Sequence, residues 1–209
     1  MSNAVRLLPH EIIKTRPFTH PSHIATDQST LRYMAGQVCV LLEYPYLASS
    51  PPHIVLFNLP GNNGWFHRIV IARPEQLREE RPLTIVGFFG RKNPGADEKV
   101  VHAFDRILVD EIADHHGLLS YSSMALQDNN YANLVVFTDA TARDHWSSSK
   151  AHAQAVQELS PTYYRTVRIY NGRLPGGIYQ HHDLTLIRAK YYDYQCRPHW
   201  QAQREILEI

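Results

Sequence analysis

The stretch LTIVGFFG at residues 83–90 carries the fold prediction. It is a run of apolar and β-branched side chains in which both faces are apolar, as is typical of a strand buried on both sides. The stretch NLVVF at 133–137 has the same character. Because helices packed on one face of a sheet cover only that face, the second face needs a cover of its own. We expect either the segment 37–72 or the sheet of a second subunit to provide it.

The segments around this strand predict a particular order of elements. A helix is expected over 98–116, where apolar residues recur with the i, i+3, i+4, i+7 spacing of an amphipathic helix. A second helix is expected over 140–159, broken at the serine run 147–149, because serine favours helix caps over helix interiors. With these helices, residues 83–172 predict a ferredoxin-like β-α-β-β-α-β core in an α+β fold. Its four expected strands lie at 83–90, 118–126, 131–139 and 163–172.

The flanking segments predict two parts of the chain. Residues 1–82 are expected to form an N-terminal extension, irregular over 1–35 and followed by additional strands. Residues 83–209 are expected to form the ferredoxin-like domain, with a further strand and a tail at its C-terminus. The expected outer strands lie at 37–44, 53–59, 65–72 and 183–194, and a short helix is expected over 198–208.

The bulk composition restricts the function classes. The chain has 209 residues, 44% of them hydrophobic, and a formal net charge of +1, which gives no electrostatic footprint for nucleic acid or an anionic membrane. Two cysteines, Cys39 and Cys196, make neither a disulfide scaffold nor a zinc site. No apolar run approaches the roughly 20 residues that span a bilayer, and the N-terminus lacks a signal-peptide pattern. We therefore expect a soluble protein of the cytoplasm.

Two residue types are abundant enough to suggest a pocket. The chain contains 13 histidines and 12 tyrosines. Histidine serves most readily as acid, base or metal ligand near neutral pH, and tyrosine offers a wide apolar face with one polar group. Together they suit a pocket for a planar or aromatic molecule; the alternative interpretation is a simple bias of composition.

One segment resembles a known family. The stretch VVFTDATARDHWSSSKAHAQAV (135–156) resembles the third strand and second helix of the antibiotic-biosynthesis-monooxygenase-like group in the dimeric α+β barrel superfamily. The stretch SPTYYRTVRIYNG (160–172) resembles the fourth strand of that group, and the resemblance extends over about 83–172. It implies a dimeric α+β barrel, hence a homodimer. The superfamily contains cofactor-free oxygenases, polyketide cyclases, haem-binding proteins and members without a known activity.

The candidate catalytic residues are His152, Trp146 and Tyr121. In the resembling group an aromatic residue and a serine precede a helical histidine, and Trp146 and His152 match that pattern. His152 would act as a base or hydrogen-bond donor in a cavity, and the alternative is a histidine that packs at a helix end. Trp146 would form a pocket wall or anchor the core, and Tyr121 would orient a phenolic ring or pack in the sheet.

These residues predict a function with alternatives. The leading hypothesis is a small-molecule enzyme that oxygenates or cyclises an aromatic or polyketide-like substrate without a cofactor. The first alternative is a haem-binding protein with His116 or His145 as axial ligand. The second alternative is a non-catalytic oligomeric protein. No metal site is predicted, because no histidine pair has the spacing of a metal motif.

Overall fold

The computed structural model describes residues 4–44, 52–58, 66–97, 107–126 and 130–206. Its main feature is one nine-stranded sheet in the order β1-β9-β8-β7-β4-β6-β5-β3-β2. Only the β1–β9 pair is parallel, and the other neighbours are antiparallel. The strands are β1 (Val5–Leu7), β2 (His53–Asn58), β3 (Phe66–Ile71), β4 (Leu83–Lys92), β5 (Leu118–Ala125), β6 (Asn130–Phe137), β7 (Tyr164–Leu174), β8 (Thr185–Asp193) and β9 (Trp200–Glu205).

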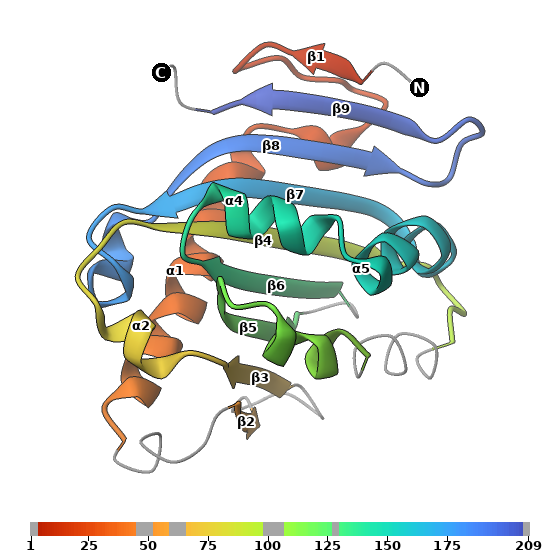
Figure 1. Ribbon diagram of the computed structural model, residues 1–209. Coiled ribbons are helices and arrows are strands. Elements are labelled where there is room, and N and C mark those ends of the chain that lie inside the picture. Colours follow the sequence, from red (N-terminus) through yellow and green to blue (C-terminus); the bar gives the residue numbers. More distant parts are fainter. Residues whose placement is uncertain (1–3, 45–51, 59–65, 98–106, 127–129, 207–209) are drawn as a thin grey trace.

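Helical segments cover both faces of this sheet (Figure 1). The long helix α1 packs on one face, called here the α1 face, and α4 and α5 pack on the opposite one, called the α4 face. The helices are α1 (Ser22–Leu42), α2 (Pro74–Arg78), α4 (Ala140–Ser147), α5 (Lys150–Gln154) and α6 (Ser160–Tyr163). The shorter turns are η1 (Pro17–Thr19), η3 (Ile112–Asp114), the π-helical η5 (Ala155–Leu159) and η6 (Ile178–Asp183).

The predicted fold class, a ferredoxin-like core of the dimeric α+β barrel type, is wrong. The chain forms a larger mixed sheet, to which the segments on both sides of 83–172 contribute paired strands. On one side β3 pairs with β5, and on the other β8 pairs with β7 and β9. The patterns of the central segment indicated its four strands correctly, but they carry no information about which outer strands join the same sheet.

A second prediction, for the segment that covers the α1 face, is also wrong. Residues 37–44 were expected to be a strand and 1–35 to be irregular, but α1 runs continuously from Ser22 to Leu42. Its buried residues Leu31, Met34, Ala35, Val38, Leu41 and Leu42 have the spacing of one helix face. A short apolar run does not distinguish a buried strand from a buried helix, and here the preceding turns of the helix decide the outcome.

Close packing holds α1 on the sheet. A Cβ atom on Gly87 of β4 would lie 2.5 Å from Leu31 Cδ1, so a larger residue here would require the Leu31 side chain to shift. Asp27 of α1 accepts hydrogen bonds from Arg168 Nε and Nη2, at 2.7 and 2.9 Å, and from the Tyr170 hydroxyl, at 2.7 Å. The ion pair therefore connects the helix to the centre of the sheet.

The remaining elements differ from prediction mainly at the C-terminus. Within the segment expected as a terminal helix over 198–208, Trp200–Glu205 form strand β9, Arg204 is fully buried, and 207–208 lie outside the described residues. Arg204 donates hydrogen bonds to the carbonyl oxygens of Leu8, Glu11 and Thr19, so it holds the N-terminal segment against β9. Of the helix expected over 98–116, residues 98–106 lie outside the described residues, and 107–111 are helical.

Candidate functional site

A cavity of about 1110 Å³ lies between the α4 face of the sheet and the segment α4–α6. A volume of this size accommodates a drug-sized molecule. Its floor comes from strands β3 to β8, and its roof from α4, α5, η5 and α6. Aromatic and apolar side chains dominate the wall, among them Phe66, Val86, Phe88, Tyr121, Tyr131, Val135, Phe137, Trp146, Val156, Leu159, Tyr164, Val167, Ile169, Tyr192 and Tyr194.

Strand register arranges the floor in rows. One row across the α4 face consists of directly paired residues, and we call it the central row. It begins and ends on a cation, because Lys190 of β8 and Arg68 of β3 are its outer members. Five strand steps of about 4.8 Å separate them, hence roughly 24 Å. The row runs Lys190, Ile169, Phe88, Asn133, Ser123, Arg68, and all of these residues line the cavity.

Local sequence positions the roof. Asp139 caps α4, since its Oδ1 accepts a hydrogen bond from the backbone N–H of Ala142 at 2.9 Å. The predicted break at the serine run is confirmed: α4 ends at Ser147 and α5 begins at Lys150. Ser149 Oγ accepts a hydrogen bond from the backbone N–H of His152 at 3.2 Å and donates one to Glu111 Oε2 at 3.3 Å. This cap therefore orders the first turn of α5.

His152 lies in the wall of the cavity and is half-buried. Burial lowers the pKa of its imidazole below the usual value, and the neighbouring His115 lowers it further. A hydrogen bond to the Ser147 carbonyl and the charge of Glu111 oppose this lowering of the pKa only in part. Its Nδ1 atom is buried and has no hydrogen-bond partner among the described residues. His152 is thus a neutral imidazole at pH 7, and its unpartnered Nδ1 atom is enclosed by the protein.

Trp146 and Tyr121 line the same cavity as His152. The Trp146 ring is 4% exposed, and its centroid lies 5.9 Å from that of His152 and 4.7 Å from that of His115. It also belongs to a buried cluster with Val135 and Phe137, so it serves the core and the wall together. Tyr121 is 6% exposed, and the Arg68 guanidinium carbon lies 5.9 Å from its ring centroid.

The two histidines considered for haem lie elsewhere. His116 and His145 are exposed, and neither lines the cavity. The ring of His145 contacts that of His115 at 5.4 Å between centroids. The break between α4 and α5 interrupts the helical stripe that would have aligned His145 with His152. Neither His116 nor His145 therefore fits as the axial ligand of a haem in this cavity.

Several wall residues were not found by sequence reasoning. Lys190, Asn133 and Arg68 enter the cavity because strand register places them on the α4 face. The alternation of side chains along each strand indicates which residues share a face. The sequence does not indicate which strands lie next to β8 and β3. Tyr170 lies on the α1 face, where its hydroxyl donates a hydrogen bond to Asp27 Oδ2.

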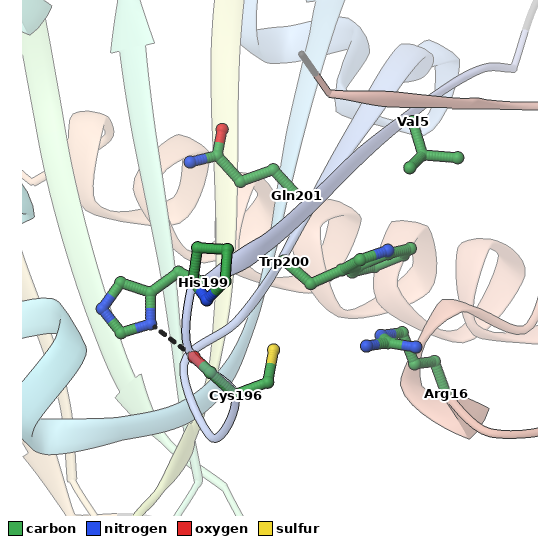
Figure 2. A pocket seen from close by; sticks show the side chains of 7 residues that line it. Val5, Arg16, Cys196, His199, Trp200 and Gln201 are labelled. Carbon is green, nitrogen blue, oxygen red and sulfur yellow. Dashed lines mark hydrogen bonds between the residues drawn. The ribbon is translucent and has the colours of Figure 1, made fainter. Parts of the chain in front are cut away.

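A second, smaller cavity of about 290 Å³ lies beside β9 (Figure 2). Arg16 stacks over the Trp200 ring, with the guanidinium carbon 4.4 Å from the centroid, and bonds Asp193 at 3.4 Å. The His199 Nδ1 atom lies 3.2 Å from the Cys196 carbonyl oxygen, within hydrogen-bond distance. Because Arg16 is already paired with Asp193 and this cavity is much smaller, the larger cavity is the candidate site.

The described residues lack one type of site and one membrane feature. No group of histidine, cysteine, aspartate or glutamate residues within the described ranges has the arrangement of a metal site. In the same part of the chain, no helix is long and apolar enough to cross a bilayer.

Comparisons with known proteins show weak similarities. No family model and no curated protein matches the chain. Protein SO0527 from Shewanella oneidensis is 14% identical with a TM-score of 0.41, over 47% of this chain and 96% of that one. PA3566 from Pseudomonas aeruginosa is 16% identical with a TM-score of 0.38, over 44% and 91%. The aldoxime dehydratase OxdRE, solved with butyraldoxime, is 12% identical with a TM-score of 0.25, over 72% and 40%. These similarities establish neither a family nor a function for the chain.

Proposed function

We propose that the protein is an enzyme that binds an aromatic or polyketide-like molecule in the large cavity and uses His152 as its base. The observation that carries this proposal is a neutral imidazole with a buried, unpartnered Nδ1 in the wall of an aromatic cavity of about 1110 Å³. Convergent polar groups in a large apolar cavity are the usual mark of a small-molecule site. A base with a pKa below neutral is in its proton-accepting form at pH 7.

The chemistry begins with a proton transfer to His152. The His152 imidazole accepts a proton from a phenol, enol or activated methylene of the bound substrate, and the substrate becomes an electron-rich anion. Trp146 and Tyr121 hold its rings in place, which supplies orientation. The anion then closes a ring onto an internal carbonyl, or it reacts with O₂ as co-substrate. In the second case an activated methylene becomes a carbonyl, and the other oxygen atom leaves as water.

Oxygen uptake tests this proposal. Anthrone is a suitable probe, because its methylene is acidified by two rings and a carbonyl. We expect one O₂ consumed per anthrone, with a rate that rises as His152 loses its proton, at a pH below 6.5. His152→Gln should lose this rate, whereas His116→Gln, an exposed histidine outside the cavity, should keep it. A wild-type rate equal to that of buffer, or an unchanged rate in His152→Gln, would refute the role of His152.

A second candidate function is haem binding through His152. The place of His152 favours it, because a histidine in the wall of a large apolar cavity is also what haem iron binds. When bound, haem would supply redox chemistry at its iron. Titration with haemin distinguishes the two candidates. A stoichiometric Soret band that is lost in His152→Ala supports haem, and a spectrum unchanged by the substitution contradicts it.

The homodimer remains a proposal. Tyr33 and Val40 lie seven residues apart on α1 and are 46% and 48% exposed, so they share one outward helix face. Ile54 of the edge strand β2 is 58% exposed. We expect light scattering of the wild type to give twice the monomer mass. The variant Val40→Glu should give the mass of one monomer. A monomeric wild type would remove this proposal.

A further inference from the structure

We propose that the cavity selects ligands that carry a carboxylate, and that Lys190 binds this carboxylate together with the Asn171 side-chain amide. The inference rests on the proposed function, since it names the substrate class of the same cavity. It concerns the end of the cavity formed by β7 and β8, and nothing in the proton transfer to His152 requires it.

Register places the two groups together on the α4 face. Asn171 of β7 pairs directly with Arg188 of β8, and Lys190 lies two residues further along the same strand. Lys190 is therefore the diagonal neighbour of Asn171, at roughly 7–8 Å between backbone positions and within reach of a long side chain. Both residues are half-buried and line the cavity.

The acidic groups near Lys190 are paired with other cations, so none of them neutralises its charge. Arg188 Nε is paired with Glu205 Oε1 at 2.7 Å, and Arg143 with Asp144 at 2.8 Å. Lys190 has no acidic partner and no hydrogen-bond acceptor among the described residues. Its direct neighbour on β7 is Ile169, and Tyr192 follows it on the same face of β8. A half-buried ammonium beside apolar groups attracts an anion more strongly than one in water does.

The balance of charge favours a monoanion. The Arg188–Glu205 pair is neutral as a unit, so Lys190 supplies one uncompensated positive charge at this end. A carboxylate matches it with one negative charge, whereas a phosphate dianion would bring an excess. Asn171 can donate its side-chain N–H groups to the same carboxylate. The next members of the central row, Ile169 and Phe88, are apolar, so the rest of the ligand is expected to be an apolar or aromatic body.

A matched pair of competitors tests the inference. N-phenyl-1-naphthylamine, a neutral fluorescent probe, reports occupation of the apolar cavity. It is displaced by 4-phenylbutyrate or by the neutral 4-phenylbutanamide, which differ in charge at the same position. For the wild type we expect the carboxylate to displace the probe at about tenfold lower concentration, the size expected for one hydrogen-bonded charge pair.

Variants of Lys190 then test whether this residue causes the preference for the carboxylate. Lys190→Met should remove the tenfold preference and leave the affinity for the amide unchanged, while Lys190→Arg should retain most of it. Lys14→Met removes an exposed lysine outside the cavity and should change nothing. A preference that is absent in the wild type, or that survives in Lys190→Met, overturns the inference. If the probe does not bind the wild type at all, the cavity and with it the proposed function fail, which is a distinct result.

Discussion

Removal of the Asp27 carboxylate is expected to cost more stability than removal of any exposed acid. Asp27 is 3% exposed and accepts two hydrogen bonds from Arg168 and one from Tyr170. Asp27→Ala leaves the Arg168 guanidinium under α1 without its counter-charge. Breaking one side of a buried ion pair costs about 3–5 kcal/mol. Tyr170→Phe removes a single hydrogen bond to a charged group and should cost about 1.5–3 kcal/mol.

Urea unfolding followed by circular dichroism measures these differences. The control is Asp183→Ala, because Asp183 is exposed and should change the unfolding free energy by less than about 0.5 kcal/mol. The double variant Asp27→Leu, Arg168→Met removes both charges and should recover most of the loss, since apolar replacement of a whole buried pair is often neutral. A cost below about 1 kcal/mol for Asp27→Ala, or a double variant less stable than both single variants, would refute the argument from an unpaired buried charge.

Three further predictions concern burial, packing and capping. His67 is 1% exposed and burial lowers its pKa to about 4, so the unfolded chain takes up the proton first as pH falls below 6.5. The unfolding free energy of the wild type should thus fall by about 3 kcal/mol between pH 6.5 and 4. Chemical unfolding at both pH values measures this loss, which should be absent in His67→Gln. An equal pH dependence of the two proteins would contradict the prediction. Gly87→Ala should destabilise by about 1–3 kcal/mol, since the new Cβ would lie 2.5 Å from Leu31 Cδ1. The melting temperature measures it, and an unchanged value would show that Leu31 moves freely. Ser149→Ala should cost about 1 kcal/mol by removing the cap of α5, whereas Ser149→Thr, which retains a hydroxyl, should keep it; thermal unfolding that does not separate the two variants would argue against the cap.

Much of the local structure was predictable because it depends on neighbours in sequence. The strand at 83–90, the helix that begins at 140 and the break at 147–149 all occur where expected. Caps and turns depend on side chains that bond their own backbone a few residues away. The same reasoning failed at 37–44, where a short apolar run is compatible with either a strand or a helix.

The candidate site was predictable only in part. His152, Trp146 and Tyr121 were named from the sequence, and the structure brings all of them to one cavity. Whether they carry the activity stays a prediction. His116 and His145 could not be separated from His152 by sequence, because the break in the helix and the position of the first helix end decide which imidazole meets the cavity. Burial of the His152 nitrogen is a property of the assembled wall.

The sequence by itself determined the four central strands between 83 and 174 and where the α4 helix begins and breaks, because those features arise from interactions over a few residues. Only the tertiary structure decided the sheet order, the cover of each face and the membership of the cavity. Asp27 meets Arg168 across 141 residues, and Arg68 meets Ser123 across 55. Such contacts depend on strand register between distant segments, which no local pattern of residues encodes.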